Sequence, residues 1–323
     1  MSRRRRVFAA IMIACLCAPG TFLRTPVSWE PPAEINAEQI QTSGETDTPG
    51  WSVEGVWHYE GESLIFGGFS SLIALPDNRL LSLSDRGARF SLTEPDQPNP
   101  KASVIRQTLA VAGPTMLADI EAATRDPESG TYWASLENNH GIHRFTADHT
   151  PTGILKLDAK ALGWSNNTGA EAMTRLNDGR FVVIPEGRRT GLIYSDDPLG
   201  EEAHTTFAYL PPVPGHATTD MVQLPDGRIV LLLRNLAPSV GIPPFESKLA
   251  IGPAPETGSE DTWAPQVTLN LAGVIPRENY EGIAARALPD GRVAIWLISD
   301  DNLSVMQRTL LAKLILDPDT IGE

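Results

Sequence analysis

Residues 279–311 read NYEGIAARALPDGRVAIWLISDDNLSVMQRTLL, two apolar runs joined by a Pro-Asp-Gly-Arg turn at residues 289–292. A turn of this composition reverses the chain between two strands. Glu281 precedes the first run, and Asp300 and Asp301 follow the second. In an antiparallel hairpin the start of the first strand lies beside the end of the second. We therefore expect these three acids at one rim of a sheet and the turn at the opposite rim.

The same order of acid, strand, turn, strand and polar residue occurs in four further copies along the chain. The five turns contain residues 76, 127, 177, 225 and 289, which are 51, 50, 48 and 64 positions apart. A repeat of about fifty residues built from strands is typical of the blades of a β-propeller. We predict an all-β propeller of six blades, counting five hairpins and one blade shared by the two termini. Five or seven blades are alternatives, and a β-sandwich with recurrent hairpins is the competing fold.

The N-terminal residues have the features of an export signal. Arg3 to Arg6 are followed by an apolar run of 12 residues, Val7 to Ala18, which is short for a membrane span. A twin-arginine signal and a lipid anchor on Cys15 are alternatives. The expected divisions are an export signal at 1–18, a linker at 19–50, one propeller domain at 51–318 and a tail at 319–323. A periplasmic or secreted protein is predicted.

Composition narrows the classes of function. The 323 residues carry a formal charge of −14 without a basic patch in the body of the chain, so nucleic acid is not an expected partner. Both cysteines, Cys15 and Cys17, lie in the export segment. The domain therefore has no disulfide, no thiolate nucleophile and no cysteine zinc site. We expect a monomer that has no membrane span once the signal is removed.

The repeated acids indicate a metal site. Innermost strands of a propeller surround a central channel, so acids at equivalent strand ends crowd one mouth. The acids concerned are Asp85, Asp119, Glu121, Glu137, Glu171, Glu186, Asp220, Glu281, Asp300 and Asp301. A cation would relieve their repulsion, and an all-oxygen ligand set favours Ca²⁺ over Mg²⁺ or Mn²⁺. The predicted metal ligands are Asp85, Glu121, Glu137, Glu171, Glu186, Glu281, Asp300 and Asp301.

Other interpretations of these acids remain open. Aspartate at a strand end often caps a turn. Capping explains the recurring glutamates at positions 121, 171 and 281 less well, because glutamate is a weak turn former. We predict that Glu121, Glu171, Glu281 and Asp300 form the catalytic centre.

Arginines follow several of the same strands. The arginine fork suits phosphate or carboxylate, so Arg86, Arg188 and Arg234 are predicted to bind an anionic substrate group. The alternative is that these arginines pair with neighbouring acids. The sequence contains no nucleophile elbow, phosphate loop, dinucleotide fingerprint or HExxH motif.

Four stretches carry a resemblance to a known family. They are FSSLIALPDNRLLSLSDRG (69–87), DIEAATRDPESGTYWASLENN (119–139), GAEAMTRLNDGRFVVIPEG (169–187) and the 279–311 segment. In these the chain resembles the phytase-like family of exported bacterial proteins, described as having esterase-like activity of phytase, and the likeness extends from residue 50 to residue 318. The resemblance implies a β-propeller, export, hydrolysis of ester or phosphoester bonds, and calcium that binds phosphate and activates water.

The chain departs from the pattern at two places. The first copy has Ser70-Ser71 where an acid is expected, and the fourth ends in Arg234-Asn235. Both changes would reduce the number of metal sites. Our hypothesis is an exported, metal-dependent phosphoesterase or esterase acting on a small anionic ester, with calcium as the expected ion. The alternative is a non-catalytic, calcium-stabilised propeller that binds a sugar, a peptide or an envelope partner.

Overall fold

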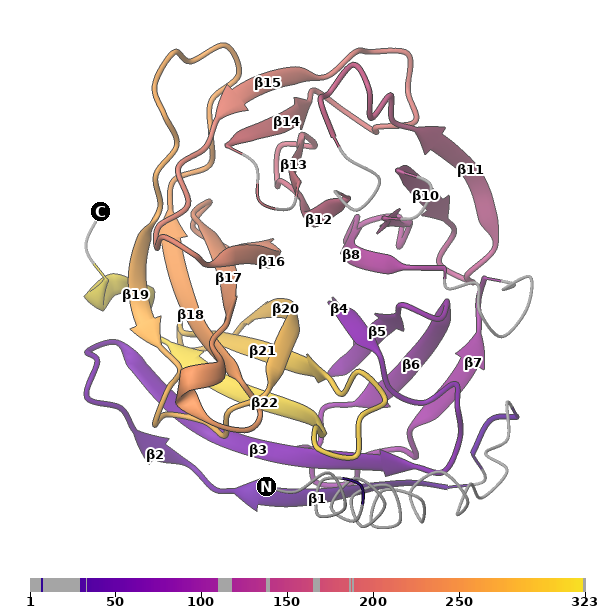
Figure 1. Cartoon of the computed structure of the whole chain (residues 1–323), viewed down its shortest axis with the longest axis vertical. Coiled ribbons are helices and arrows are strands. Elements are labelled where there is room, and N and C mark those ends of the chain that lie inside the picture. The colour runs from indigo at the N-terminus through magenta and orange to yellow at the C-terminus, as the bar shows by residue number, and fades with distance from the viewer. Residues whose placement is uncertain are drawn as a thin grey trace.

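The computed structural model describes residues 7, 30–32, 34–109, 118–137, 140–164, 169–185, 187 and 189–321. These residues form five antiparallel sheets placed in a ring, with one strand of each sheet innermost (Figure 1). The predicted all-β propeller is confirmed. The predicted export signal at 1–18 lies outside the described residues except for Val7. No helix within the described part of the chain has the length and apolar character needed to cross a membrane.

Four of the sheets are four-stranded blades, and in each the strands pair in chain order from the axis outward (Figure 1). The first is β4 (Phe69–Leu75), β5 (Arg79–Ser84), β6 (Ala88–Thr93) and β7 (Val104–Gln107). The second is β8 (Ile120–Arg125), β9 (Tyr132–Leu136), β10 (Gly141–Phe145) and β11 (Pro151–Lys156). The third is β12 (Ala170–Arg175), β13 (Phe181–Pro185), β14 (Thr190–Tyr194) and β15 (Thr205–Ala208). The fourth is β16 (Ala217–Gln223), β17 (Ile229–Leu236), β18 (Phe245–Gly252) and β19 (Gln266–Asn270), and a 3₁₀ turn, η1 (Pro238–Val240), follows β17.

The fifth sheet joins the two ends of the chain. It contains β1 (Ile35–Gln41), β2 (Gly44–Glu45), β3 (Trp51–Gly61), β20 (Asn279–Ala287), β21 (Val293–Asp300) and β22 (Thr309–Leu316), and the 3₁₀ turn η2 (Pro318–Thr320) follows. Strand β22 pairs with β21 on one side and with β3 on the other, from Tyr59 opposite Thr309 to Trp51 opposite Leu316. This pairing closes the ring. Strand β1 then pairs with β3, so residues 35–41 of the predicted linker add to this blade.

The prediction of six blades is not what the described residues show, because they form five sheets. The sixth blade was inferred by counting the terminal strands separately from the fifth hairpin. In the structure β3 and β22 complete the blade that β20 and β21 begin. The fifth hairpin and the terminal strands therefore form one blade, and the alternative of five blades fits the described residues.

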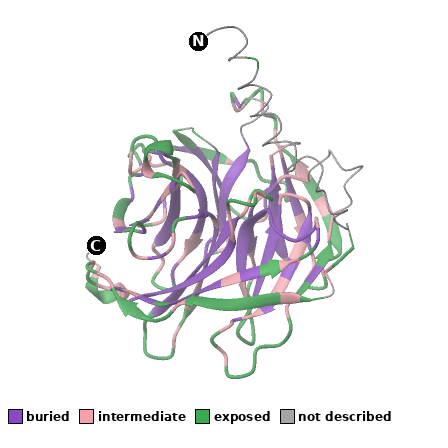
Figure 2. Ribbon diagram, turned by 60° about the horizontal axis from the view of Figure 1, so that its bottom comes forward, coloured by how far each residue is buried: buried purple, intermediate pink, exposed green. Residues whose placement is uncertain are grey.

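The core lies within and between the blades (Figure 2). Every residue of β21 and β22 is buried, in keeping with the nearly continuous apolar run of their sequences. Lys313 is the one basic residue in these two strands; its ammonium pairs with Asp96 and lies 5.3 Å from the centroid of the Trp296 ring. Pairing and the aromatic face compensate the buried charge. Strands β21 and β22 are thus covered on both faces.

A glycine permits the innermost strands of two blades to approach closely. A Cβ at Gly282 in β20 would lie 2.7 Å from the backbone carbonyl carbon of Ser71 and 2.9 Å from the backbone nitrogen of Leu72 in β4. We expect Gly282→Ala to lower the free energy of unfolding by about 1–3 kcal/mol, because the backbone of a neighbouring blade must move. The measurement is denaturant unfolding. The control is Gly44→Ala in β2, where a Cβ meets nothing within 4 Å and stability should be unchanged.

Candidate functional site

Each innermost strand has an irregular register near its start, of the kind produced by a β-bulge. The shifts fall at Phe69–Ser71, Ile120–Ala123, Ala170–Ala172, Thr218–Asp220 and Tyr280–Gly282. The bulged segments place Ser70, Glu121, Glu171, Thr219 and Glu281 at equivalent positions around the ring. A bulge turns a side chain away from its regular direction and is common beside active sites. Three of the five positions carry glutamate.

Asp220 has a different place from the one that the repeat pattern indicated. Thr219, not Asp220, occupies the bulge of its blade. The Asp220 side chain is 1% exposed and accepts hydrogen bonds from the backbone nitrogens of Met221 at 2.8 Å and Ile283 at 2.9 Å. Burial raises the pKa of this carboxyl well above its usual range. Asp220 therefore joins β16 to β20, and it is not part of the acidic mouth.

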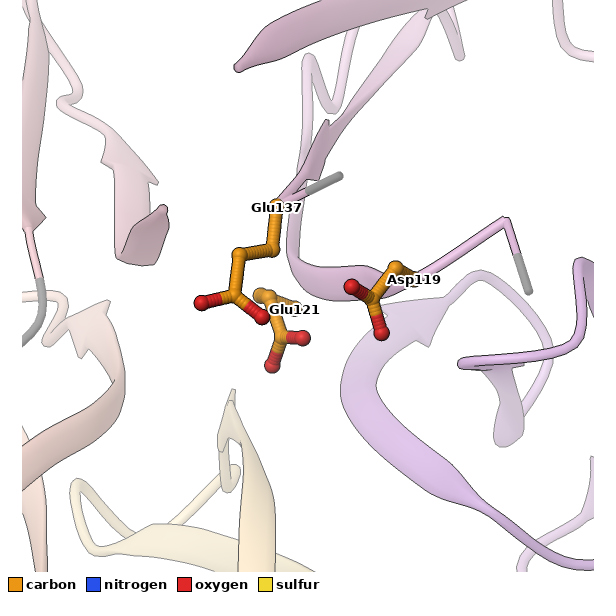
Figure 3. Close-up of side chains that lie close together, drawn as sticks. All are labelled: Asp119, Glu121 and Glu137. Carbon is orange, nitrogen blue, oxygen red and sulfur yellow. The ribbon is translucent and has the colours of Figure 1, made fainter. Parts of the chain in front are cut away.

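Three acids from one blade lie together at the mouth (Figure 3). Asp119 immediately precedes β8, Glu121 lies in the bulge of β8, and Glu137 follows β9. Each offers a carboxylate oxygen within 4.8 Å of the others. The Glu137 backbone nitrogen donates to the Asp119 carbonyl at 2.9 Å, which holds the two chain segments side by side. Of these residues only Asp119 was absent from the predicted ligands; its position two residues before Glu121 was the available signal.

Acids of other blades act on this cluster through their charge. Burial raises the pKa of Glu121 well above its usual range, and the charges of Glu171, Glu281, Asp119 and Glu137 raise it further. Glu121 is therefore within electrostatic reach of the bulge glutamates of two other blades. Glu171 is the more buried of these glutamates, at 8% exposure, whereas Glu121 is half-buried. The propeller brings acids of three blades to one place.

Asp85, which follows β5, also belongs to the mouth. Burial raises its pKa to about 7, Arg86 opposes this shift, and the charges of Asp119 and Glu281 add to it. Its backbone carbonyl accepts a hydrogen bond from the Asp119 nitrogen at 2.6 Å. This carboxyl can therefore change its protonation state near neutral pH.

The two acids at the end of β21, Asp300 within the strand and Asp301 after it, have different surroundings. Asp300 is 7% exposed, and burial and the charge of Glu281 raise its pKa well above the usual range. Asp301 instead accepts hydrogen bonds from the backbone nitrogens of Gly68 at 3.2 Å and Leu303 at 2.9 Å and from the Thr309 hydroxyl at 3.0 Å. Asp300 thus contributes charge to the mouth, whereas Asp301 connects its own loop by a hydrogen bond to Gly68, just before β4.

The three arginines predicted to bind substrate differ from one another in their contacts. Arg234 forms an ion pair with the Glu281 carboxylate and donates to the Asn279 side-chain oxygen at 2.9 Å. Arg86 donates to the backbone oxygen of Leu64 at 2.5 Å. Arg188 and the predicted ligand Glu186 lie outside the described residues. For Arg234 the alternative interpretation, pairing with a neighbouring acid, describes the structure.

The sequence matches the family described as "Phytase-like: Esterase-like activity of phytase" over residues 65–303. The chain belongs to this family. The match covers most of the propeller, including every described acid of the mouth, and confirms the resemblance seen in the repeats. Among curated proteins, none matches this member of the family.

Several solved structures are similar to this phytase-like propeller. A thermostable family-43 glycoside hydrolase matches with a TM-score of 0.49 and 13% identity over 79% of this chain and 92% of its own. Regucalcin, a calcium-binding protein of Agrobacterium tumefaciens, matches with a TM-score of 0.45 and 11% identity over 88% and 91%. Hydrazine synthase of Kuenenia stuttgartiensis matches with a TM-score of 0.38 and 12% identity over 85% of this chain, which spans 65% of the hydrazine synthase chain.

Proposed function

We propose that this phytase-like propeller is a metal-dependent hydrolase of esters or phosphoesters, and that its acidic mouth binds a divalent cation, with Ca²⁺ as the best fit. The observation that carries the proposal is the cluster of Asp119, Glu121 and Glu137, whose oxygens lie within 4.8 Å of one another among further acids. Crowded carboxylates raise one another's pKa, and a cation would remove that cost.

The donor set fits the ion. Ca²⁺ takes carboxylate oxygens at about 2.3–2.6 Å, so two ligands on opposite sides of one ion are about 4.6–5.2 Å apart. The three oxygens lie within 4.8 Å of one another, which is not farther apart than one such ion can span. All three donors are oxygens, which hard cations prefer to nitrogen or sulfur. No described basic residue forms an ion pair with Asp119 or Glu121.

Different residues of the mouth would have different roles in the reaction. A bound divalent cation supplies Lewis acidity and lowers the pKa of water. Asp119, Glu121 and Glu137 would hold the cation, and Glu171 and Asp300 would add negative charge around it. Asp85 would accept or release a proton at its carboxyl, because its pKa of about 7 matches neutral conditions. Arg86 lies next to Asp85 and would attract the anionic group of the substrate.

The cellular setting completes the proposal. We propose that residues 1–18 export the protein to the periplasm or the medium, where calcium is available. The sequence has no cysteine after residue 17, so the exported domain contains no thiol that could be oxidised there. The proposed substrate is a small anionic ester or phosphoester, and the proposed form is a monomer.

The test is turnover of small chromogenic carboxyl and phosphate esters by protein treated with EDTA, before and after calcium is restored. We expect hydrolysis with calcium and none with the chelator. Absence of turnover on both ester classes with calcium present would remove the catalytic proposal. If calcium raised the melting temperature without any turnover, the protein would be the calcium-stabilised binding propeller instead.

A further inference from the structure

We infer that Arg234 is a built-in counter-cation of the mouth and that it limits the mouth to a single divalent ion, at Asp119, Glu121 and Glu137. The inference rests on the proposed metal site and adds to it a role for Arg234, which was expected to bind substrate. It divides the mouth into two parts, one neutralised by the protein and one by a bound ion.

The contacts of Arg234 hold its guanidinium in place. One terminal nitrogen pairs with the Glu281 carboxylate and also donates to the Asn279 side-chain oxygen at 2.9 Å. The Asn279 amide in turn donates to Glu281 at 2.9 Å and to Asp300 at 3.4 Å. The Phe245 ring lies 6.0 Å from the guanidinium carbon, within range of a cation–π contact. Arginine, asparagine and two acids from three strands thus form one network.

The charge of Arg234 extends over several acids. Glu281, Glu171, Glu121 and Asp300 each act to raise its pKa, in that order. Its side chain is 23% exposed and that of Glu281 is 13% exposed, so water screens this pair less than an ion pair on the outer surface. A fixed guanidinium beside Glu281 already supplies the positive charge that a second metal would bring.

A second divalent ion near Glu281 would have to displace this arrangement. It would meet the guanidinium charge, and it would have to break the bond between Glu281 and Arg234 to gain a ligand. On the other side, Asp119 and Glu121 form no ion pair with a described basic residue. The two sides of the mouth therefore differ in their need for an external cation.

The experiment counts calcium ions. Chelator-treated protein is titrated with CaCl₂ by calorimetry at pH 8, and the unmodified chain is compared with Arg234→Gln and Arg234→Lys. We expect one ion per chain for the unmodified protein and for the lysine variant, and two for Arg234→Gln. The control is Arg292→Gln, which breaks an exposed arginine–aspartate pair at the turn between β20 and β21 and should leave the count at one.

The outcomes separate this inference from the proposed function. Two ions in the unmodified protein, or one ion with unchanged affinity in Arg234→Gln, would overturn the inference and leave metal dependence standing. No binding to the unmodified protein together with binding to Arg234→Gln would overturn both metal dependence and the single-ion inference. No binding to either would overturn both. The number of calcium ions bound by the unmodified protein tests the inference even if the Arg234 variants do not fold.

Discussion

Glu121→Gln is expected to lower the rate of calcium-dependent ester hydrolysis strongly and at the same time to raise the melting temperature of the metal-free protein. Glu121 is a member of the three-acid cluster, and burial and four neighbouring acids raise its pKa. Its ionised form is therefore costly in the folded protein when no cation is bound. Glutamine has nearly the same shape as glutamate but no charge, so the metal-free protein becomes more stable.

The loss of activity follows from the same charge. Lewis-acid stabilisation by a metal contributes several kcal/mol, and each 1.36 kcal/mol is about a factor of ten in rate, so kcat/KM should fall about 10²–10³-fold. The melting temperature with chelator at pH 8 should rise by a few degrees, since about 1 kcal/mol corresponds to about 2–4 °C in a domain of 150–250 residues. Kinetics with calcium and thermal melts with chelator measure the two effects.

The matched control is Glu128→Gln in the turn that connects β8 to β9. Glu128 belongs to the same blade but is exposed and lies at the far end of the hairpin. Both activity and metal-free stability should remain unchanged in this variant. A Glu121→Gln protein that loses stability with chelator and keeps its activity would contradict the assignment of Glu121 to a charged, metal-holding mouth.

The metal-free protein should become less stable as pH rises from 6.5 to 8.5, and calcium should reverse this loss. Burial raises the pKa of the Asp85 carboxyl from 3.8 to about 7. Between these values the folded state binds more protons than the unfolded state, so stability falls as pH rises and the loss is complete above the folded pKa. Glu121 and Asp300 are also raised and act in the same direction.

The pH range separates the carboxyl groups from the histidines. Burial lowers the pKa of His143, His149 and His216 below 6.5, so their contribution to stability has the opposite sign, is largest below that value and fades within about one pH unit above it. Thermal melts with chelator at pH 6.5 and 8.5 therefore report the Asp85 carboxyl through the difference between the unmodified protein and Asp85→Asn, to which the histidines contribute equally. Asp85→Asn should flatten the dependence. A melting temperature that rises over this range in the unmodified protein would refute the prediction.

Calcium should stabilise the protein most at the upper end of the range. An ion at about 100 times its dissociation constant adds about 2.7 kcal/mol, which corresponds to about 5–10 °C. The gain should be largest at pH 8.5, because protons compete with the ion for the same oxygens at lower pH. Magnesium at equal concentration serves as the comparison, since it accepts such a ligand cluster less readily.

Local pattern in the chain was sufficient for the hairpins and for the side of the ring on which the acids lie. Alternating apolar runs on either side of Pro-Asp-Gly-Arg turns specify antiparallel strand pairs, since the turn sets which residues become neighbours. Glu121, Glu171 and Glu281 were recognisable because each occupies the same position before such a run. Their convergence followed from the propeller, whose innermost strands all begin near one axis.

The ring closure and the partners of each charged group were decided only in three dimensions. The number of blades depends on β3 pairing with β22, two strands almost at opposite ends of the chain, and no local pattern reports such a pairing. A bulge moves the equivalent position by one residue, which is why Thr219 and not Asp220 faces the others. Arg234 meets Glu281 across 47 positions of sequence, and Asp301 meets Gly68 across 233. Residue order along the chain determines which charges exist, but packing between blades determines which of them pair with an opposite charge of the protein, because partners such as Arg234 and Glu281 come from different blades.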